Sequence, residues 1–432
     1  MGWIAMKQLT AALVGAGNRG CVYADYCMDE PEELKIVAVV DPHDIHRAEA
    51  QARYALPDEC CFSDLDDFLA ADIACDFVIN ATMDQQHYIT AKKLLEAGYP
   101  MQLEKPIVPN REQLLELQRL THEKGVKVNV CHVLRYTPFF KRIKQLILDD
   151  VIGRIMTMEM NEHVWIAHFL DSYVRGKWNS EEKCGSGFLL AKSCHDMDLA
   201  CWLNNTTKPV RVSSIGSRSQ FIPENAPKGA TEFCYTCPHN DTCLYSAQKV
   251  HLEFDSLPFQ TWLGMGKPID EITKEEKAEY LKHSDYGRCA YNSGGDINDR
   301  QTVNIEFENG SLASFTMVGG SCKAGRYLHI VGTKGEIEGF LEEGKFVLRT
   351  FDRSEGKFTF NEETIDINAE IHSKSAFGGH AGGDYAIMHE LVRYLNGDNT
   401  SISITDIDDS INSHLVVYAA EESIKTRKTV EI

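Results

Sequence analysis

Leu13-Val14-Gly15-Ala16-Gly17-Asn18-Arg19-Gly20 contains a G-x-G-x-x-G motif that directly follows the apolar run Leu9 to Val14. A second apolar run, Ile36 to Val40, comes after a segment long enough for a crossover helix and is followed by Asp41. Asp41 stands about twenty residues beyond the last glycine, the spacing of an acidic residue that binds a ribose in dinucleotide-binding units. The stretch therefore predicts a strand, a glycine turn, a helix and a second strand that bind a dinucleotide.

Each glycine of the motif has a separate expected role. Gly15 allows the tight turn out of the strand, Gly17 lets backbone N–H groups approach a pyrophosphate, and Gly20 lets the helix pack on the sheet. The N-terminus of that helix carries partial positive charge, which favours phosphate binding. We expect Asn18 and Arg19, in the first turn of the helix, to line the same site.

Asp41 also indicates which dinucleotide is bound. Its carboxylate is placed to accept hydrogen bonds from both ribose hydroxyls and would repel a 2′-phosphate. We therefore predict NAD as the cofactor, with NADP less favoured. Arg19, His43 and Arg47 lie nearby in the sequence and keep NADP as the alternative.

Length and composition narrow the class of protein. The 432 residues are too many for one ordinary core and suggest two domains, and the formal net charge of -20 disfavours nucleic acid and anionic membranes as partners. The chain starts without a sustained apolar segment, so we expect no signal peptide or membrane anchor and a cytoplasmic location. In a reducing compartment, 14 cysteines indicate buried thiols or metal ligands instead of a disulfide framework.

The pattern of the chain changes near residue 133. Residues 1–133 alternate strand and helix patterns, which predicts an NAD-binding Rossmann domain with a parallel sheet covered on both faces. Residues 134–432 predict an α/β substrate-binding and oligomerisation domain built on a large, mostly antiparallel open sheet. Residues 220–300 are polar and poorly periodic, so we expect an irregular insertion that shapes or covers the site. The expected fold class is thus α/β plus α+β.

Turn and cap residues predict the bounds of several elements. Asn309-Gly310 between alternating runs is a strong hairpin signal, and a second hairpin is expected around Thr333 to Glu336. Asn110 is expected to cap a helix that Gly125 ends. The buried side of that helix is predicted to carry Leu114, Leu115, Leu117 and Leu120. Further expectations are a strand over Val126–Val133 and helices over Lys192–Leu203, Asp384–Leu395 and Asp406–Thr426.

Glu104-Lys105-Pro106 follows the predicted Rossmann unit and precedes the predicted antiparallel sheet. In that context the chain resembles the Gfo/Idh/MocA family, NAD(P)-dependent oxidoreductases that act mostly on sugars, inositols and their derivatives. The resemblance covers nearly the whole chain and includes Arg135-Tyr136-Thr137-Pro138 and His195. It implies that Lys105 lies beside the nicotinamide and the substrate hydroxyl and that Pro106 follows a cis peptide bond. It also implies homodimers or homotetramers that pair through the C-terminal sheet, and cofactor contacts from Ala81, Thr82, His87, Glu104 and Lys105.

The chain departs from the common family pattern beside the catalytic histidine. Many members carry an aspartate four residues before it, whereas this position is Ala191 here. The local sequence Lys192-Ser193-Cys194-His195-Asp196-Met197-Asp198 resembles a variant branch with the pattern K-x-x-H-D-x-D. Lys192 lies three residues before His195 and is expected to share its helical face. The ammonium group of Lys192 would then take the place of the aspartate that other family members carry beside the histidine.

Oxidation of a secondary alcohol needs a base for the hydroxyl proton and an acceptor for the hydride. His195 is a suitable base because imidazole titrates near neutral pH. Lys105 can hydrogen-bond the same oxygen, and like charges nearby would lower its pKa until it could serve as the base itself. The sequence predicts His195 and Lys105 as the catalytic pair and leaves their roles open.

Candidate substrate-binding residues gather mainly in Glu162–Trp178. Aromatic side chains suit the apolar faces of a sugar ring, and His or Arg side chains bind its hydroxyls. Lys192 either binds substrate or pairs with Asp196 or Asp198. His380 either caps a helix or binds substrate, since His380 to Asp384 resembles the H-x-x-x-D run of NAD-dependent glycosidases. The predicted substrate-binding set is Tyr136, His168, Arg175, Trp178, Lys192, Asp198 and His380.

Cys234, Cys237 and Cys243 have metal-like spacing within the predicted insertion. Zinc would stabilise a segment that has little core of its own, with His239, Cys289 or another thiol as the fourth ligand. Free thiols are the alternative for the same cluster.

Three functions are compatible with these patterns. The leading prediction is NAD-dependent hydride transfer between a secondary hydroxyl of a sugar, glycoside or cyclitol and the nicotinamide. An NAD-dependent glycosidase would use the same groups for transient oxidation, elimination and re-reduction, without net formation of NADH. An NAD-binding sensor would leave Lys105, Lys192 and His195 idle.

Overall fold

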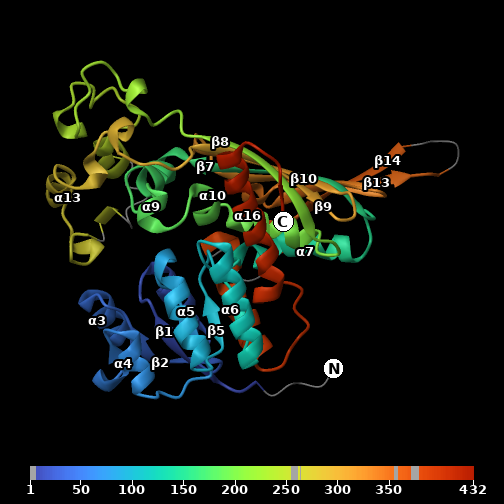
Figure 1. Cartoon of the computed structure of the whole chain (residues 1–432), viewed down its shortest axis with the longest axis horizontal. Helices are drawn as coiled ribbons and strands as arrows, with labels where there is room; N and C mark the ends of the chain where they lie inside the picture. The colour runs from blue at the N-terminus through green and yellow to red at the C-terminus, as the bar shows by residue number, and fades with distance from the viewer. Residues whose placement is uncertain (1–5, 254–260, 263, 355–358, 371–378) are drawn as a thin grey trace.

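The structure is a computed structural model that describes residues 6–253, 261–262, 264–354, 359–370 and 379–432. These residues form two sheets, which occupy the lower and upper parts of Figure 1. Strands within residues 9–130 make a six-stranded sheet, and strands within residues 155–431 make a nine-stranded sheet. No helix in this described part of the chain is long and apolar enough to cross a membrane.

The first sheet is parallel throughout, with the strand order β3-β2-β1-β4-β5-β6. Its strands are β1 (Leu9–Val14), β2 (Leu34–Val40), β3 (Cys61–Phe62), β4 (Phe77–Asn80), β5 (Met101–Leu103) and β6 (Val128–Val130). Its helices are α1 (Asn18–Ala24), α2 (Tyr26–Asp29), α3 (Asp44–Arg53), α4 (Leu65–Ala70), α5 (His87–Glu96) and α6 (Arg111–Lys124). All residues of the central strand β4 are buried, because both faces of the sheet are covered. The Rossmann-type sheet predicted from the glycine motif is confirmed.

The second sheet has the order β14-β13-β12-β11-β7-β10-β9-β8-β15, and only its β7–β10 pair is parallel among the described strands. The predicted hairpin at Asn309-Gly310 joins β9 to β10, and the second predicted hairpin joins β11 to β12. β13 and β14 project as an arm at one end of the molecule (Figure 1). The strands are β7 (Ile155–Trp165), β8 (Pro209–Ser217), β9 (Arg300–Phe307), β10 (Leu312–Ser321), β11 (Gly325–Gly332), β12 (Gly335–Phe340), β13 (Lys345–Asp352), β14 (Thr359–Asp366) and β15 (Val430–Glu431).

Helices from the second half of the chain pack on both sheets. Leu391 of α15 belongs to the core of the first sheet, together with Ile79 of β4. Val416 of α16 belongs to the core of the second sheet, whereas Ile411 of the same helix packs under the first one. These helices therefore join the two halves. The helices are α7 (Pro138–Leu148), α8 (Ile166–Phe169), α9 (Glu181–Cys184), α10 (Phe188–Ala191), α11 (Cys194–Leu203), α13 (Lys274–Leu281), α14 (Ile367–Glu370), α15 (Gly383–Leu395) and α16 (Ile407–Thr426).

The described residues between 220 and 299 consist largely of turns, short 3-10 and π-helical segments and the helix α13. Thr273 and Glu276 form a capping box at the start of α13. Trp262, Ile272 and Leu281 make a small separate apolar cluster.

Three local expectations are wrong in their bounds or burial. The helix expected over Lys192–Leu203 begins only at Cys194, as α11, because the chain turns at Lys192 and Ser193 after the separate short helix α10. The strand expected over Val126–Val133 is reduced to β6, since the residues after it turn toward the second half. Leu115 is exposed, because α6 turns only the face of Leu114 and Leu117 to the core.

Candidate active site

The turn between β1 and α1 has the shape of a phosphate-binding site. Gly15 has a φ of +89°, and a Cβ on it would lie 2.6 Å from the Ala81 carbonyl oxygen, while a Cβ on Gly20 would lie 2.0 Å from the Gly15 oxygen. At Gly17 a Cβ would meet nothing within 4 Å, so space remains in front of the helix. The described first turn of α1, which begins at Asn18, has no acidic side chain and no side-chain cap. Its N–H groups therefore fit the pyrophosphate of a dinucleotide.

Asp41 follows β2 and lies beside this turn. Its Oδ2 accepts a 2.8 Å hydrogen bond from the Ala16 N–H, and Oδ1 accepts one of 2.9 Å from the His43 N–H. Burial raises the pKa of Asp41, but hydrogen bonds from His46 and the backbone outweigh burial and lower the pKa overall. The carboxylate is therefore ionised at neutral pH, and its remaining lone pairs can accept hydrogen bonds from ribose hydroxyls.

The loop after β4 carries Ala81 and Thr82, and His87 begins α5. Ala81 abuts Gly15, as the close approach of a Gly15 Cβ shows. The ring of His87 is buried, with Nδ1 2.6 Å from the Pro106 oxygen and Nε2 2.9 Å from the Thr82 oxygen. His87 thus ties the loops after β4 and β5 together, and both of its ring nitrogens are engaged by the protein.

Arg19 links α1 to β5 and α15. Its Nε lies 3.1 Å from Glu104 Oε1, and its Nη2 lies 2.6 Å from Asp384 Oδ1. His380 Nδ1 lies 3.0 Å from Asp384 Oδ2. Burial opposes the charge of Asp384, but hydrogen bonds from His380 and Arg19 prevail and hold its pKa well below the usual range. Two predicted cofactor residues, Arg19 and Glu104, are therefore joined by ion pairs to the second half of the chain.

Lys105 stands at the carboxyl end of β5. The Lys105–Pro106 peptide bond is cis, as the family resemblance implies. The Lys105 ammonium donates a 2.9 Å hydrogen bond to the backbone oxygen of Ala191. Ala191 is the position at which many family members carry the aspartate, so here a neutral carbonyl group is the neighbour of the lysine.

His195 lies in the first turn of α11 and is 5% exposed. Its ring centroid is 5.9 Å from that of His132 and 6.2 Å from that of His380. Burial first, and then the charge of Lys105, lowers the pKa of His195 well below its usual range. The imidazole is therefore neutral at physiological pH, and its Nδ1 has no hydrogen-bond partner among the described residues. A neutral imidazole can accept a proton from a hydroxyl group.

Lys192 belongs to a buried cluster of charges beside His195. Arg326 Nε lies 2.7 Å from Glu162 Oε2 and 2.9 Å from Asp196 Oδ1, while Lys192 Nζ lies 3.7 Å from Glu162 Oε1. Lys192 thus forms its ion pair with Glu162 of β7, and not with Asp196 or Asp198, the partners that the sequence suggests. Burial lowers the pKa of Lys192. Burial also raises the pKa of Asp196 to about 7, although the charge of Arg326 acts against that rise.

His168 and Trp178 reach the same region. Burial and then the charge of Lys192 lower the pKa of His168 to about 3, so this ring is neutral. Trp178 Nε1 donates a 3.3 Å hydrogen bond to Asp84 Oδ2, which also accepts one of 2.7 Å from Ser186 Oγ. Trp178 therefore connects the loop after β4 with the second half of the chain.

Tyr136 and Asp198, two predicted substrate residues, make buried contacts within the protein instead. The Tyr136 hydroxyl lies 3.2 Å from Thr405 Oγ1. Both oxygens of Asp198 accept hydrogen bonds from the Arg135 guanidinium, at 2.7 and 2.6 Å. These contacts join α11 to the segment between the two sheets.

Arg175, a third predicted substrate residue, anchors the segment 220–300. Its guanidinium is buried and donates to the backbone oxygens of Arg288 at 2.8 Å and Tyr245 at 2.5 Å. The structure thus gives Arg175 a place under this segment and does not bring it together with Lys105 and His195.

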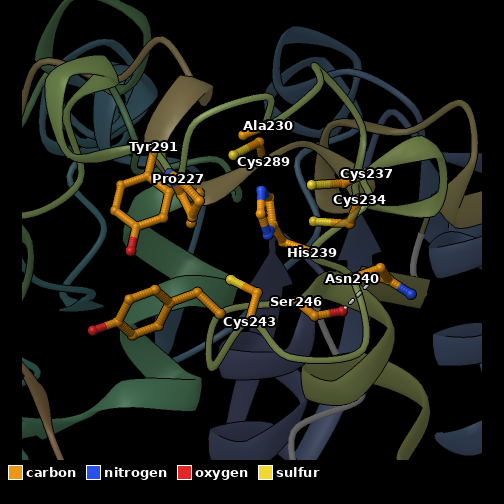
Figure 2. Close-up of a pocket in the computed structure, with 12 residues that line it drawn as sticks. Pro227, Ala230, Cys234, Cys237, His239, Asn240, Cys243, Ser246, Cys289 and Tyr291 are labelled. Carbon is orange, nitrogen blue, oxygen red and sulfur yellow. Dashed lines mark hydrogen bonds between the residues drawn. The ribbon is translucent and has the colours of Figure 1, made fainter.

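The zinc prediction for Cys234, Cys237 and Cys243 is not supported. Figure 2 shows these thiols, with Cys289, distributed around the ring of His239 in one pocket. Among the described residues, however, no three His, Cys, Asp or Glu side chains are arranged to hold a metal ion. His239 Nε2 lies 2.9 Å from a backbone oxygen, that of Lys228, and Cys234 Sγ lies 3.6 Å from another, that of Arg288. None of these four cysteines forms a disulfide bond.

Several site residues are not predicted by sequence reasoning. Arg326 and Glu162 meet because they are register partners of β11 and β7, a pairing that no local motif signals. Asp196 stands within the H-D-x-D run and could have been found there. His132, whose two ring nitrogens lack hydrogen-bond partners among the described residues, lies in a strand-to-turn segment without a distinctive pattern.

The parallel sheet, the glycine turn and Asp41 together define a dinucleotide-binding α/β protein. Residues 9–132 match the family model described as an oxidoreductase family with an NAD-binding Rossmann fold, and residues 144–432 match that of the C-terminal alpha/beta domain of the same family. The chain belongs to the Gfo/Idh/MocA family and is an NAD(P)-dependent oxidoreductase.

Relatives and solved structures agree with this assignment. The Bacillus subtilis oxidoreductase YteT is 26% identical over 73% of this chain and 72% of its own length. Inositol 2-dehydrogenase of Corynebacterium glutamicum is 30% identical over 35% of this chain and 44% of its own length. An NAD binding oxidoreductase from Klebsiella pneumoniae has the same fold, with a TM-score of 0.71 at 17% identity over 98% of this chain and 99% of that one. A levoglucosan dehydrogenase in complex with NADH aligns with a TM-score of 0.69 at 18% identity, over 98% and 99% of the two chains.

Proposed function

We propose that this protein transfers a hydride between a secondary hydroxyl group of a sugar, glycoside or cyclitol and NAD. One observation carries the proposal. The Lys105 ammonium, at the carboxyl end of β5, binds the Ala191 carbonyl oxygen, and its charge acts on the buried, neutral ring of His195. Relatives named as inositol and D-xylose dehydrogenases support this substrate class.

His195 and Lys105 have complementary roles in this proposal. When bound, NAD supplies the acceptor for the hydride. The imidazole of His195 takes the hydroxyl proton, because its low pKa keeps it unprotonated before the reaction. The Lys105 ammonium binds the same oxygen and stabilises negative charge as it develops. His168, His380 and Lys192 bind the remaining hydroxyl groups of the substrate.

We propose NAD, in preference to NADP, because Asp41 is ionised where the adenosine ribose would bind. A 2′-phosphate would be repelled by this carboxylate. The nearest arginine offers little compensation, since Arg47 donates to the backbone oxygen of Asp41 at 2.7 Å and forms an ion pair with Asp44.

A panel assay tests the proposed reaction. The protein is incubated with NAD and free sugars, inositols or aryl glycosides, and both NADH and released aglycone are followed. Stoichiometric NADH with an oxidised sugar is the expected result. Absence of both NADH and released aglycone with every member of the panel, in a protein that binds NAD, would instead favour the sensor.

The NAD-dependent glycosidase is the second candidate function. It is favoured by the His380–Asp384 pair, which lies against the ring of His195. A glycosidase of this kind would release aglycone without net NADH, so the same assay separates the two.

A further inference from the structure

Lys177 presents an ammonium group beside the loop after β4. Its Nζ lies 3.3 Å from Met83 Sδ and 4.2 Å from the centroid of the Trp178 ring. Among the described residues, no carboxylate lies within ion-pair distance of this ammonium. The lysine side chain is exposed to solvent, yet desolvation by its surroundings lowers its pKa. Asp84 and Glu104 act on this ammonium only from beyond ion-pair distance, so no direct carboxylate partner in the described part of the chain neutralises its charge.

The backbone around Lys177 is held on both sides. Arg175 is anchored by backbone oxygens of the segment 220–300. A Cβ on Gly176 would lie 2.2 Å from the Asp171 oxygen, so the chain is tightly packed there. Trp178 is fixed by its hydrogen bond to Asp84 and by a 3.2 Å backbone bond to the Ser172 oxygen. The position of the ammonium is thus a built feature of the fold.

Lys177 lies beside the loop that borders the glycine turn. Met83 is two residues from Ala81, which abuts the glycine turn at Gly15. The hydrogen bond to Asp41 is the main cause that raises the pKa of His46, and the positive charge of Lys177 acts against this rise. Lys105, at the nicotinamide end, in turn helps to lower the pKa of Lys177, after the larger effect of burial. The ammonium therefore lies within electrostatic range of both ends of the site, and the group between the two ends of a dinucleotide is its pyrophosphate.

We propose that the Lys177 ammonium binds a phosphate group of the dinucleotide. The N-terminus of α1 supplies N–H groups to the same anion from the first sheet, while Lys177 supplies a full charge from the second half of the chain. Such charge-assisted contacts are roughly twice as strong as neutral ones. Because the net charge of the chain is -20, local cations of this kind are needed to concentrate an anionic cofactor. Cofactor affinity consequently depends on residues outside the Rossmann sheet.

Calorimetric titration of the full chain with NAD, in the absence of substrate, tests the proposal. Lys177→Met keeps the aliphatic stem on Trp178 but removes the charge, and we expect it to weaken NAD binding by about 10- to 100-fold. Lys177→Arg should restore most of the affinity. Lys183→Ala removes the same charge from an exposed position in α9 and should leave binding unchanged. Equal Tm values for the four proteins show that folding is preserved.

Two further ligands identify the group that Lys177 binds. ADP-ribose contains the pyrophosphate but no nicotinamide, so Lys177→Met should weaken it as strongly as NAD, whereas adenosine should bind the two proteins equally. The affinity of the native protein for NAD should also fall more steeply with salt than that of Lys177→Met. Unchanged NAD affinity in Lys177→Met, or a loss confined to NADP, would overturn the proposal. Because substrate is absent, these results do not depend on the reaction proposed above.

Discussion

At the scale of single residues, no carboxylate stands at the position where many family members carry the aspartate. Ala191 offers Lys105 a backbone oxygen there, and the acids Glu162 and Asp196, beside Lys192, form ion pairs with Arg326. The groups whose charges act on His195 are Lys105, His132, His380 and Arg326. After burial, these charges help to keep His195 unprotonated, as its proposed role as a base requires.

Asp41 should decide the choice between NAD and NADP. Replacing Asp41 by Asn keeps its shape and removes its charge, so NAD binding should weaken by about 1 to 3 kcal/mol while NADP binding is spared or improved. Asp41→Ala should show the same change of preference, with some added loss of order at Ala16 and His43. Calorimetric titration with both cofactors measures the effect. Tighter binding of NADP than NAD by the native protein would contradict the assignment.

Lys192 should act on the substrate more than on the chemical step. Its ammonium pairs with Glu162 and has no hydrogen bond to Lys105 or His195 among the described contacts. We expect Lys192→Ala to raise KM by about tenfold and to change kcat by less than about threefold, the pattern of lost uniform binding. Steady-state kinetics on an established substrate gives both numbers. A fall in kcat equal to that in kcat/KM would instead place Lys192 in the transition state.

At the scale of elements, the two glycines of the turn between β1 and α1 have different roles: we expect Gly15 to be needed for folding and Gly17 for cofactor binding. Gly15 has a positive φ and Gly17 does not, although both belong to one motif. Gly15→Ala should lower Tm by several degrees, because the Cβ would collide with the Ala81 backbone. Gly17→Ala should fold normally, since its Cβ meets open space, but should bind NAD at least about tenfold more weakly because the methyl group occupies the approach of the phosphate. Thermal melts and calorimetry distinguish the two, and equal loss of Tm in both variants would contradict this division.

Element bounds were predictable where a cap or turn residue marks them. Asn110 accepts a hydrogen bond from the Gln113 N–H at the start of α6, and Gly125 ends the helix in a left-handed conformation. The start of α11 carries no such mark. Ser193 makes no side-chain cap, and periodicity alone extends the helix back to Lys192. The break matters for function because it turns Lys192 toward Glu162 of β7.

At the scale of the whole molecule, the order of the elements along the chain was predictable from the sequence, but the contacts between distant elements were not. The glycine motif, the E-K-P run and the Asn309-Gly310 hairpin signal local structures, and each is present. The contacts of Arg326 with Glu162, and of Arg19 with Asp384, join residues far apart in the chain. Such pairs depend on sheet register and on the return of α15 to the first sheet, which no local pattern specifies.

Buried neutral histidines should make the protein sensitive to acid. Among the described histidines, six have lowered pKa values, mainly through desolvation: His132, His168, His195, His251 and His414, and the more exposed His380. Below pH of about 6.5 the unfolded chain binds protons that the folded chain refuses, so stability falls by about 1.4 kcal/mol per pH unit for each such proton.

Five of the described acids act in the opposite direction, because burial raises their pKa values. The pKa values of Asp171, Asp196 and Glu421 rise to about 6, 7 and 7, and those of Asp198 and Asp406 are raised as well, so the contribution of these acids to stability is lost as pH rises through their pKa values. The six histidines outnumber them, and Tm should therefore fall between pH 7.5 and 5.5. Calorimetric melts across this range measure the balance, and a constant or rising Tm on acidification would contradict it.

The central claim is that Lys105 and His195 carry the chemistry while other residues hold the cofactor. Its most direct test is the turnover of Lys105→Ala and His195→Ala on an established substrate, with the dissociation constant of NAD measured on the same samples. We predict that kcat falls by about 10²- to 10⁴-fold in each variant while NAD affinity stays within about threefold of the native value. Full turnover in both variants would contradict the claim and direct the search for the base to His168 and His380.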